Sequence, residues 1–559
     1  MADKAKVKFT LDGRELEAVE GTLVIDAAKA AGIEVPHYCY HPGLGNPGVC
    51  RLCMVEVEGA PKPMVSCRLP VKAGMVVKSD TARARKAQAS SLEFHLANHP
   101  LDCPVCDQAG ECFLQDYYMR YGLYRSAVRE DKLHKEKRLD IGPTVVLDQE
   151  RCILCTRCTR FLSQVTKTNE LGIFNRGDHD VLAPYPGRRV DNPYSGNIVD
   201  VCPVGALTDK DFRFKVRVWY LDETPSLCTT CARGCSIDLH ANNRRPWHTP
   251  DERVVRFKPR HNPEVNGWWM CDEGRYSYKR IDSRLRLKFA SRLAGEEPEA
   301  VAAKEAAARA AQELSALTKA KGAEGLAVVL SGTLSNEDLF AARRLFVETL
   351  HCGMVLVAPG PDQLGEGDDL LRRKERVPNH MGALTLGFGA RIPDTTWGGL
   401  RAAAEAGKLW GLYVVDRDPL AVWGEGSEKL LSGLTFTAYQ GSHANRFSTA
   451  AQWVLPACSF AEEDATFTNF EGQVQRSRAA VPPLGESRPD WEIFRDMLAA
   501  LEAPQAWTSA GDVFGELAKA EPCFAPLAFE DLGKHGKRLA RAPGPGSGPP
   551  GDGSGGGRA

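Results

Sequence analysis

Two kinds of hydrophobic pattern divide the chain into an N-terminal and a C-terminal half. At the N-terminus, VKFTLDGRELEA alternates apolar and polar residues on both sides of Asp12-Gly13, a dipeptide that favours a tight hairpin turn. The next segment, TLVIDAAKAAG, has the spacing of an amphipathic helix, with Thr22 as its predicted cap and Gly32 as its predicted stop. The sequence therefore begins with a predicted hairpin followed by a short helix.

Helical spacing returns twice before the middle of the chain. The segment from Thr81 predicts a helix that ends near His99, and a second helical stretch begins at Cys112. Residues 160–200 are rich in Gly, Asn, Asp and Pro, and this composition predicts loops instead.

The C-terminal half alternates helices with short, continuous apolar strands. Residues 298–322 predict a long helix of strong helix formers, and a second helix follows a Ser335 cap. Strands are expected over 325–332, 354–360, 409–415 and near 434–438. This alternation predicts an α/β domain with a largely parallel sheet. Residues 542–559 are so rich in glycine and proline that we expect a flexible tail.

Clustered cysteines dominate the first half. Fifteen of the eighteen cysteines lie between Cys39 and Cys271, and with His99 they make sixteen candidate metal ligands. These divide into four groups of four: Cys39, Cys50, Cys53 and Cys67; His99, Cys103, Cys106 and Cys112; Cys152, Cys155, Cys158 and Cys202; Cys228, Cys231, Cys235 and Cys271. No cysteine in this region is left over.

Three chemistries use clustered cysteines: disulfides, zinc sites and iron–sulfur clusters. Disulfides are disfavoured, because the N-terminus has no apolar signal-peptide core that would direct the chain to an oxidising compartment. A chain of 559 residues can also build hydrophobic cores without disulfide staples. Zinc is the stronger alternative, since two C-x2-C pairs at a suitable distance form a zinc knuckle. Three of the four groups, however, are not built from such pairs.

The third group favours iron–sulfur chemistry. Its C-x2-C-x2-C run places three thiolates within seven residues, and Cys202 follows much later with a proline directly after it. This spacing is typical of bacterial ferredoxins, although Leu162 stands where their nearby fourth cysteine would be. One [4Fe–4S] cluster is therefore expected here. The fourth group, a C-x2-C-x3-C run with the distant Cys271, suits another.

The first group has a wider first loop and a late fourth ligand. This arrangement suits a flat [2Fe–2S] cluster, although plant-type ferredoxins have a shorter first spacing, C-x4-C-x2-C. The order of hairpin, helix and cysteine loop is that of a β-grasp ferredoxin.

The second group contains only three cysteines, so a four-iron cluster there needs another ligand. His99 lies four residues before Cys103 and is the candidate; the alternative is a structural histidine at a helix end, a role for which His95 is available. Histidine ligands occur in Rieske centres, where they raise the reduction potential.

Composition sets the remaining bounds. The chain is 43% hydrophobic, enough for several domain cores, and its net charge of −1 gives no general attraction to nucleic acid. No run of eighteen apolar residues is present that could span a membrane. We therefore expect a soluble protein of a reducing compartment that does not bind nucleic acid.

The four groups, in this order, resemble those of the large iron–sulfur subunit (the G subunit) of bacterial NADH:quinone oxidoreductase, the respiratory complex I. The matching segments are CRLCMVEV at 50–57, HPLDCPVCDQAGEC at 99–112, CILCTRC with VCPVGAL, and CDEGR at 271–275. Residues 453–475 also resemble a molybdopterin-oxidoreductase segment; the residues on its pattern are Thr466, Asn469, Glu471, Gly472 and Gln475. The resemblance covers roughly residues 5–500.

This resemblance implies one [2Fe–2S] cluster on the first group, three [4Fe–4S] clusters on the others, and no molybdopterin. It implies electron transfer from a flavin-bearing NADH-oxidising subunit toward the quinone site, in the peripheral arm of the complex. The partners would be that flavin-bearing subunit, the 24-kDa-type [2Fe–2S] subunit and the quinone-side iron–sulfur subunits. No residue here would act as a catalytic acid, base or nucleophile. The implied location is cytoplasmic, on the inner face of the cell membrane through the complex.

The fold class expected is an α+β multidomain protein: a β-grasp [2Fe–2S] ferredoxin, [4Fe–4S] ferredoxin-like domains, and an α/β domain of molybdopterin-oxidoreductase type. The expected boundaries are 1–80 for the β-grasp domain, 81–120 for the His/Cys domain, 121–220 for the ferredoxin-like domain, 221–280 for the fourth cluster domain, 281–500 for the α/β scaffold, and 501–559 for a C-terminal extension with the tail.

The rival class is the iron–sulfur or catalytic subunit of an NAD-linked formate dehydrogenase or hydrogenase complex, which shares these domains. Active molybdenum enzymes usually have a lysine two residues after the last cluster cysteine, where this chain has Glu273. The remaining cysteines, Cys352, Cys458 and Cys523, have the contexts of structural residues, and about 290 residues remain after Cys271. We therefore expect a scaffold and not a molybdenum site in the second half.

Overall fold

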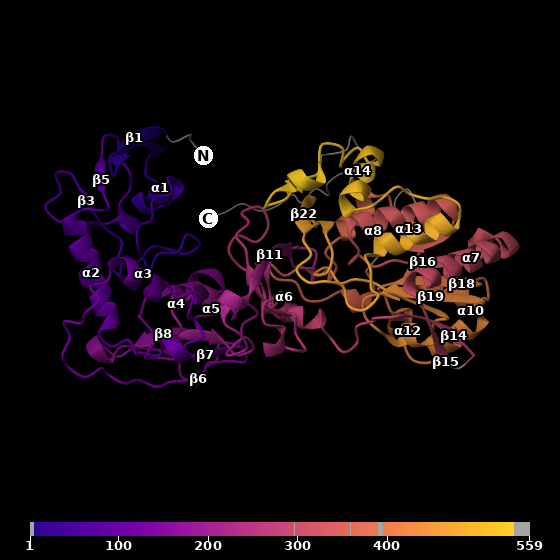
Figure 1. Cartoon of the computed structure of the whole chain (residues 1–559), viewed down its shortest axis with the longest axis horizontal. Helices are drawn as coiled ribbons and strands as arrows, with labels where there is room; N and C mark the ends of the chain where they lie inside the picture. The colour runs from indigo at the N-terminus through magenta and orange to yellow at the C-terminus, as the bar shows by residue number, and fades with distance from the viewer. Residues whose placement is uncertain (1–4, 296, 358, 389–394, 541–559) are drawn as a thin grey trace, which may run out of the picture. The chain divides into compact units, whose positions relative to one another are not determined.

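The computed structural model describes residues 5–295, 297–357, 359–388 and 395–540 (Figure 1). The predicted flexible tail, 542–559, lies outside the described residues. The chain forms two compact units, each described here by itself. Unit 1 comprises Met1–Thr224, Ile237–Asp282 and Asp368–Arg372, and unit 2 comprises Pro225–Ser236, Ser283–Gly367 and Arg373–Ala559.

Unit 1 begins with a five-stranded mixed sheet in the order β2-β1-β5-β3-β4. Its strands are β1 (Lys6–Leu11), β2 (Arg14–Val19), β3 (Met54–Val57), β4 (Met64–Val65) and β5 (Val76–Lys78). The predicted hairpin is confirmed: β1 and β2 are antiparallel, and Asp12 and Gly13 turn the chain with φ of 49° and 78°. β1 pairs in parallel with β5, and α1 (Val24–Ala30) packs its apolar face against the sheet. This is the expected β-grasp fold.

The start of α1 differs from the prediction, while its end agrees. The N-cap is Leu23, with no side-chain cap; Thr22 instead uses its backbone, donating to Val19 O and accepting from Val71 N. Tertiary pairing of the backbone therefore overrides the local capping preference of threonine. At the other end Gly32 has φ of +72°, and Ile33 N–H donates to Ala28 O at 2.8 Å, as in a glycine-terminated helix.

The two helices predicted around the second cysteine group are confirmed. α2 (Ala82–Leu96) begins at Thr81, whose side chain accepts from Ala84 N–H, and α3 (Phe113–Tyr121) follows Cys112 directly. Between them Cys103–Val105 form a 3₁₀ turn. The cysteines of the second group therefore lie between the ends of two helices.

The prediction of loops over 160–200 was wrong. This region contains a π-helical turn over Phe161–Val165 continuing α4 (Arg157–Arg160), the hairpin β8 (Leu171–Phe174) and β9 (Val181–Pro184), and α5 (Asn197–Val201). Its Gly and Asn residues serve the turns between these elements: Asn169, Asn175 and Gly177 all have positive φ. Strands of four residues are too short to show alternation in such a sequence.

The rest of unit 1 is built from short strands. β6 (Leu139–Asp140), β7 (Val145–Leu147) and β10 (Leu207–Asp209) form an antiparallel sheet in the order β10-β7-β6. β11 (Asp222–Leu227) and β12 (Ser236–Ala241) cross the unit boundary, and β12 pairs antiparallel with β13 (Val254–Pro259). α6 (Asp272–Arg275) follows Cys271.

Unit 2 contains a seven-stranded sheet in the order β15-β14-β20-β19-β18-β16-β17. Its strands are β14 (Ala290–Ala294), β15 (Glu297–Val301), β16 (Leu326–Val329), β17 (Met354–Leu356), β18 (Gly411–Val415), β19 (Phe436–Gly441) and β20 (Trp453–Pro456). The five strands β17, β16, β18, β19 and β20 are parallel, which confirms the predicted α/β domain with a largely parallel sheet.

The long helix predicted over 298–322 begins later than expected. Residues 297–301 form the edge strand β15, and α7 runs over Ala303–Lys321. Pro298 explains the difference, because proline lacks an N–H and is tolerated on an edge strand but not inside a helix.

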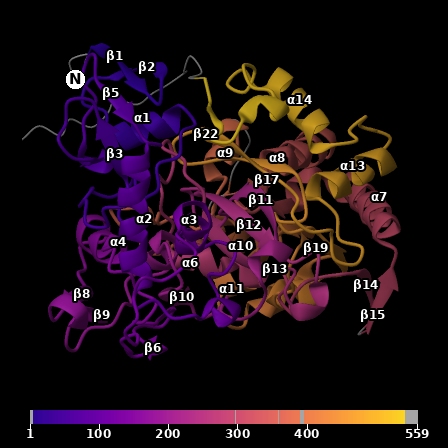
Figure 2. The same ribbon diagram turned by 60° about the vertical axis from the view of Figure 1, so that its left-hand side comes forward.

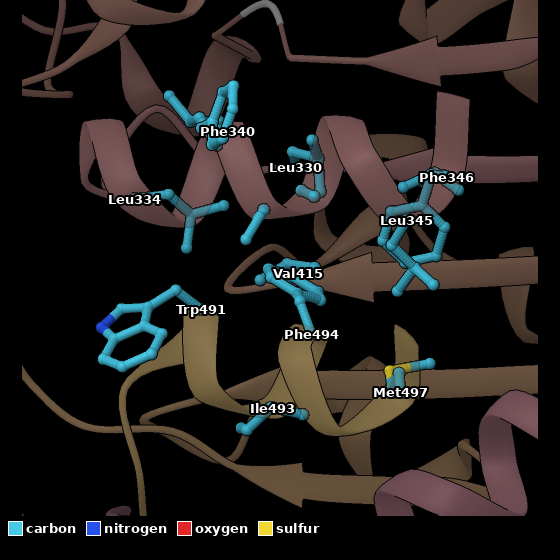
Figure 3. Close-up of a cluster of buried hydrophobic side chains, with 14 of the residues drawn as sticks. Leu330, Leu334, Phe340, Leu345, Phe346, Val415, Trp491, Ile493, Phe494 and Met497 are labelled. Carbon is cyan, nitrogen blue, oxygen red and sulfur yellow. The ribbon is translucent and has the colours of Figure 1, made fainter. Parts of the chain in front are cut away.

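Helices cover both faces of this sheet. One face packs against α7, α8 (Asn336–Ala342), α13 (Asp490–Ala500) and α14 (Ala510–Ala520), and α13 contacts both α7 and α8 (Figures 1 and 2). Figure 3 shows this core near α8 and α13, where the rings of Phe346 and Phe494 lie 5.8 Å apart. The other face packs against α10 (Trp397–Glu405), α11 (Pro419–Trp423) and α12 (Arg446–Ala450). Ser335 caps α8 as predicted, through a 3.0 Å bond from Asp338 N–H.

The remaining elements of unit 2 are short. β21 (Ala465–Thr468), β22 (Gln473–Ser477) and β23 (Lys537–Arg538) form a three-stranded sheet, and α9 (His380–Thr385) contacts β21. No helix in the described residues combines the length and the hydropathy needed to cross a lipid bilayer.

Several carboxyl groups are buried in unit 2 near the carboxyl ends of its parallel strands. Glu337 accepts two bonds from Thr466, each 2.8 Å long, yet burial raises the pKa of its carboxyl to about 8. Burial, together with the negative charges of Asp338 and Asp490, also raises the pKa of Glu463 far above its usual range. The core of unit 2 therefore favours neutral carboxyls.

Because Glu337 is buried, we expect unit 2 to lose stability as the pH rises from about 4.5 to about 8. The lower limit is the ordinary pKa of a glutamate, and the upper limit is the pKa of Glu337 in the folded chain. The folded chain holds a proton there that the unfolded chain releases, so unfolding is increasingly favoured across this window. Glu337→Gln should remove the part of this pH dependence that Glu337 causes. At about 1.4 kcal/mol per unit of pKa, that part amounts to at most about 5 kcal/mol of unfolding free energy across the window.

Thermal unfolding at several pH values would measure this effect. The control is Glu299→Gln, an exposed carboxylate on β15 that should leave the slope unchanged. A Glu337→Gln protein with the same pH dependence as the parent would contradict the assignment.

Candidate metal centres

The four cysteines of the first group lie together in the β-grasp domain. All four are buried, and the Cys39 N–H points at Cys50 Sγ, 3.5 Å away. Side-chain hydrogen bonds with Cys50 and Cys67 lower the pKa of the Cys39 thiol, and one with Cys67 lowers the pKa of Cys53 to about 7. Each thiol of this group therefore contacts at least one other.

Local backbone geometry produces this convergence. Arg51, with φ of 54°, turns the chain between Cys50 and Cys53. Cys67 lies in a 3₁₀ turn over Ser66–Arg68, and the Ser66 N–H donates to Cys53 O at 2.9 Å. The late fourth ligand is thus returned to the loop by the pairing of β3 with β4.

The three cysteines of the second group differ in their exposure to solvent. Cys106 and Cys112 are buried and Cys103 is exposed. Burial raises the pKa of the Cys112 thiol to about 11, and the nearby Cys106 and Cys103 contribute in the same direction. The three cysteines are therefore close enough to affect one another electrostatically.

His99 follows α2 and is partly buried. Its Nδ1 is buried and makes no hydrogen bond with any described residue, and burial lowers the pKa of the ring to about 4. A neutral imidazole with an unpaired nitrogen has the chemistry of a metal ligand. Its ring lines a cavity together with Cys152 of the third group, however, so its assignment to the second group stays a prediction.

A partly buried ion-pair network fixes the loop of the second group. Glu111, between Cys106 and Cys112, accepts bonds of 3.0 and 2.9 Å from Arg256 and one of 3.1 Å from Lys258, both on β13. Although burial opposes it, these cations lower the pKa of Glu111 to about 2. Sequence reasoning missed Glu111, which its position between two candidate ligands could have indicated.

The second and third groups meet at a single glycine. A Cβ on Gly205, three residues after Cys202, would lie 2.2 Å from Cys106 Sγ. Arg151, directly before Cys152, also reaches the second loop and bonds Asp102 Oδ2 at 2.8 and 3.0 Å. The two groups are therefore neighbours within unit 1.

The third group surrounds a small cavity with an almost wholly apolar lining. Cys152, Cys155, Cys158 and Cys202 all line it, and burial raises the pKa of each thiol. Residues of the hairpin β8/β9, Ile173 and Leu182, complete the lining. The region predicted as loops thus covers part of this site, and an apolar cover restricts the access of water.

Four thiols around one cavity fit an iron–sulfur cluster. Uncompensated thiolates would be costly in this apolar setting, and bound iron offsets that cost because it stabilises the thiolate form. Two backbone features shape the run: Leu154 and Thr156 have φ of 53° and 64°, and the Leu154 N–H donates to Cys152 Sγ at 3.4 Å.

The fourth group is divided between the units. Cys228, Cys231 and Cys235 are buried in unit 2, where the Cys228 N–H donates to Cys235 O at 2.8 Å. Cys271 is buried in unit 1 as the N-cap of α6, and its Sγ accepts from Gly274 N–H at 3.4 Å. The assembly of this group stays a prediction.

The molybdopterin-type segment holds the three-cysteine loop of unit 2. Gln475 Nε2 donates to Gly234 O at 2.8 Å, and Asn469 Nδ2 donates to Arg233 O at 3.2 Å. The Phe470 N–H donates to Ala232 O at 3.0 Å. Two of the pattern residues therefore support the loop between Cys231 and Cys235 directly.

The other three pattern residues lie on or near the same hairpin of β21 and β22. Thr466 bonds the buried Glu337, Gly472 has φ of +80° in the turn, and Glu471 lies 4.0 Å from Arg233. All five therefore have structural partners in unit 2.

The carboxyl edge of the parallel sheet, where α/β folds bind ligands, is acidic in this chain. Asp416 directly follows β18, Asp490 bonds Gln440 of β19, and both raise the pKa of neighbouring carboxyls. A molybdopterin carries phosphate, and carboxyls, whether neutral or ionised, offer an anionic group no positive charge. Arg286 nearby is already paired with Glu462, and both side chains are fully buried.

The three cysteines outside the four groups, and Glu273, have ordinary structural surroundings. Cys352, Cys458 and Cys523 are buried, and Cys352 Sγ donates to Leu326 O at 3.1 Å. Glu273 lies on α6, 3.9 Å from Arg372 of the same unit. In the described ranges, no three His, Cys, Asp or Glu side chains are arranged around a point that could hold a single metal ion. The thiolates of a cluster are shared among two or four irons and do not all converge on one point.

Family models match most of the chain. In order, they are a 2Fe-2S iron-sulfur cluster binding domain (4–82), an NADH-ubiquinone oxidoreductase-G iron-sulfur binding region (88–127), an NADH-quinone oxidoreductase subunit 3 ferredoxin-like domain (142–208), a molybdopterin oxidoreductase Fe4S4 domain (221–283) and a molybdopterin oxidoreductase domain (293–500). Together with the folds above, these matches define an iron–sulfur protein that carries both [2Fe–2S] and [4Fe–4S] binding domains and a domain of molybdopterin-oxidoreductase type.

Whole-chain relatives identify the family. The NADH-quinone oxidoreductase G subunit of Rickettsia bellii is 29% identical over 93% of this chain and 90% of its own length. The 78 kDa subunit of NADH-ubiquinone oxidoreductase from Neurospora crassa is 30% identical over 88% of this chain and 80% of its own. The chain therefore belongs to the family of NADH-quinone oxidoreductase G subunits.

A solved NAD+-reducing [NiFe]-hydrogenase chain is also similar, at 34% identity over 38% of this chain and 92% of that chain. Its TM-score of 0.34 carries no argument about fold.

Gly205→Ala should displace Cys106, because the added Cβ would meet Sγ at 2.2 Å. We expect the second group to lose its cluster, so that iron falls by about four atoms per chain. Iron and acid-labile sulfide analysis of anaerobically purified protein would measure this loss. Gly515→Ala in α14, where a Cβ meets nothing within 4 Å, is the control. Full iron content in Gly205→Ala would refute the contact.

Proposed function

We propose that this chain carries single electrons within an NADH-quinone oxidoreductase, from a flavin-bearing subunit toward the quinone-side iron–sulfur subunits. The bound clusters would supply the chemistry, accepting and releasing one electron at a time. The observation that carries the proposal is the close packing of three cysteine groups inside unit 1. Arg160, two residues after Cys158, donates to Cys39 O, and a Cβ on Gly205 would lie 2.2 Å from Cys106 Sγ.

The chain's own residues would hold and tune the clusters. Backbone N–H groups point at Cys50, Cys152 and Cys271, and such bonds stabilise the negative charge of a thiolate ligand. Burial of most ligands lowers the local dielectric and restricts water. On this proposal none of these residues acts as an acid, base or nucleophile.

The ligand sets proposed are those of the sequence. The first group would hold a [2Fe–2S] cluster, and the second, third and fourth would each hold a [4Fe–4S] cluster. The domain boundaries proposed are likewise 1–80, 81–120, 121–220, 221–280, 281–500 and 501–559. The α/β domain in 281–500 would serve as a scaffold without molybdopterin, consistent with its acidic strand ends.

The partners proposed are the flavin and NADH-binding subunit, the 24-kDa-type [2Fe–2S] subunit and the quinone-side iron–sulfur subunits of the complex. The names of the relatives support this assembly. The location proposed is cytoplasmic, on the inner face of the cell membrane through the complex.

Elemental analysis tests the proposal as a whole. Anaerobically purified protein should contain about 14 iron atoms per chain with matching sulfide, since one binuclear and three tetranuclear clusters are expected. Molybdenum or tungsten near one atom per chain would instead indicate an enzyme of the formate dehydrogenase class. Zinc in place of iron would contradict both functions.

His99→Cys should lower the reduction potential of the second cluster while the cluster stays bound. The substitution replaces a neutral imidazole by an anionic thiolate, which disfavours the more negative, reduced state. A redox titration followed by EPR would measure the shift. His95→Cys is the matched control, because His95 Nδ1 already bonds Ser91 O at 2.7 Å. An unchanged potential in His99→Cys would remove His99 from the ligand set.

A further inference from the structure

Arg157 lies at the place where the loops of three cysteine groups meet. It is part of α4, inside the C-x2-C-x2-C run, and only 4% of its surface is exposed. Its Nη2 donates to Tyr40 O at 2.5 Å, its Nη1 donates to Val201 O at 3.3 Å, and its guanidinium lies 5.5 Å from the centre of the Phe113 ring. One side chain therefore contacts all three loops.

Each of these partners is the direct neighbour of a candidate ligand. Tyr40 follows Cys39 of the first group, Phe113 follows Cys112 of the second, and Val201 precedes Cys202 of the third. The guanidinium thus connects the loops through their backbone and an aromatic ring.

No carboxylate forms an ion pair with Arg157 among the residues that the structure describes. Its Nε is buried without a hydrogen bond. Arg151, equally enclosed, differs: it lies 2.8 Å from Asp102 and 3.2 Å from Asp148. An unpaired buried cation is strongly destabilising unless other negative charge compensates it.

Cysteines of the first and third groups flank Arg157 and its hydrogen-bond partners. Arg157 lies between Cys155 and Cys158, Tyr40 follows Cys39, and Val201 precedes Cys202. Burial lowers the pKa of the Arg157 guanidinium. Tyr117, a phenol whose own pKa burial raises to about 12, opposes that effect, as do the charges of Cys155, Cys202 and Cys39. The three cysteines belong to the first and third groups only. Thiolate ligation by a cluster would keep this negative charge in place permanently.

We propose that Arg157 is a shared counter-charge for the first and third groups, a positioning residue that raises the reduction potentials of both clusters. The inference rests on the proposed function, because it requires clusters at these two groups. Each one-electron reduction adds a negative charge to a thiolate-ligated cluster, and a fixed positive charge in a low dielectric stabilises the reduced state more than the oxidised one.

Arg157→Met in the full-length, cluster-loaded chain tests this inference. We expect EPR-monitored redox titration to show lower midpoint potentials for the [2Fe–2S] cluster and for the [4Fe–4S] cluster of the third group. The second cluster should shift less, because Arg157 reaches that loop through the Phe113 ring and not through a hydrogen bond beside a ligand. Arg157→Lys should restore most of both shifts, since it keeps the positive charge.

Arg160→Met is the matched control. Arg160 belongs to the same helix and also donates to the first loop, at Cys39 O and Gly45 O, but it is only partly buried. Water screens its charge, so its removal should shift the first and third clusters less than Arg157→Met does.

Three outcomes would overturn the proposal: unchanged potentials in Arg157→Met with full iron content, equal shifts in Arg157→Lys, or equal shifts in Arg160→Met. If Arg157→Met does not retain iron, Arg157→Gln, which also removes the charge but keeps a donor, gives the same comparison. Parent protein without iron would instead contradict the proposed function itself, so the two failures are distinguishable.

Discussion

The burial of thiols inside the chain is the constraint on which unit 1 depends. Thirteen of the fifteen cysteines in the four groups are buried, and several lie in surroundings that raise the pKa of a thiol. Such positions are unfavourable for bare thiolates and favourable for thiolates that bind iron. The loops of unit 1 are consequently shaped less by regular secondary structure than by the need to bring four side chains to one place.

Polar residues that bind no metal hold these loops in place. Glu111 is clamped between two cations of β13, Arg151 joins two loops through carboxylates, and Arg157 joins three loops without any. Gly205 permits the second and third groups to approach, because any side chain there would displace Cys106 Sγ. Adjacent groups share these supports, so the sites are parts of one structure and not independent modules.

Unit 2 keeps the layers of a cofactor-binding α/β fold but has different chemistry at its strand ends. The half-buried Asp416 and the buried Asp490 and Glu463 place carboxyls where an anionic cofactor would need cations. Asn469 and Gln475, which lie on a molybdopterin-type pattern, bond the loop that carries Cys231 and Cys235. A fold associated with a cofactor thus serves here to support a cysteine loop.

Local spacing determined the hairpin at Asp12-Gly13, the strands of unit 2, the short cysteine runs and the family, because each depends on residues close together in sequence. The distant members of the cysteine groups, Cys67, Cys202 and Cys271, were assigned by count, and the ligand sets stay predictions. Only the tertiary structure decided the backbone role of Thr22, the edge strand at Pro298 and the hairpin β8/β9 over the third site. Only the tertiary structure, likewise, placed Arg157 between three loops. Its contacts at Tyr40 and Val201 are distant in sequence, and no local pattern encodes which distant segments will pack together.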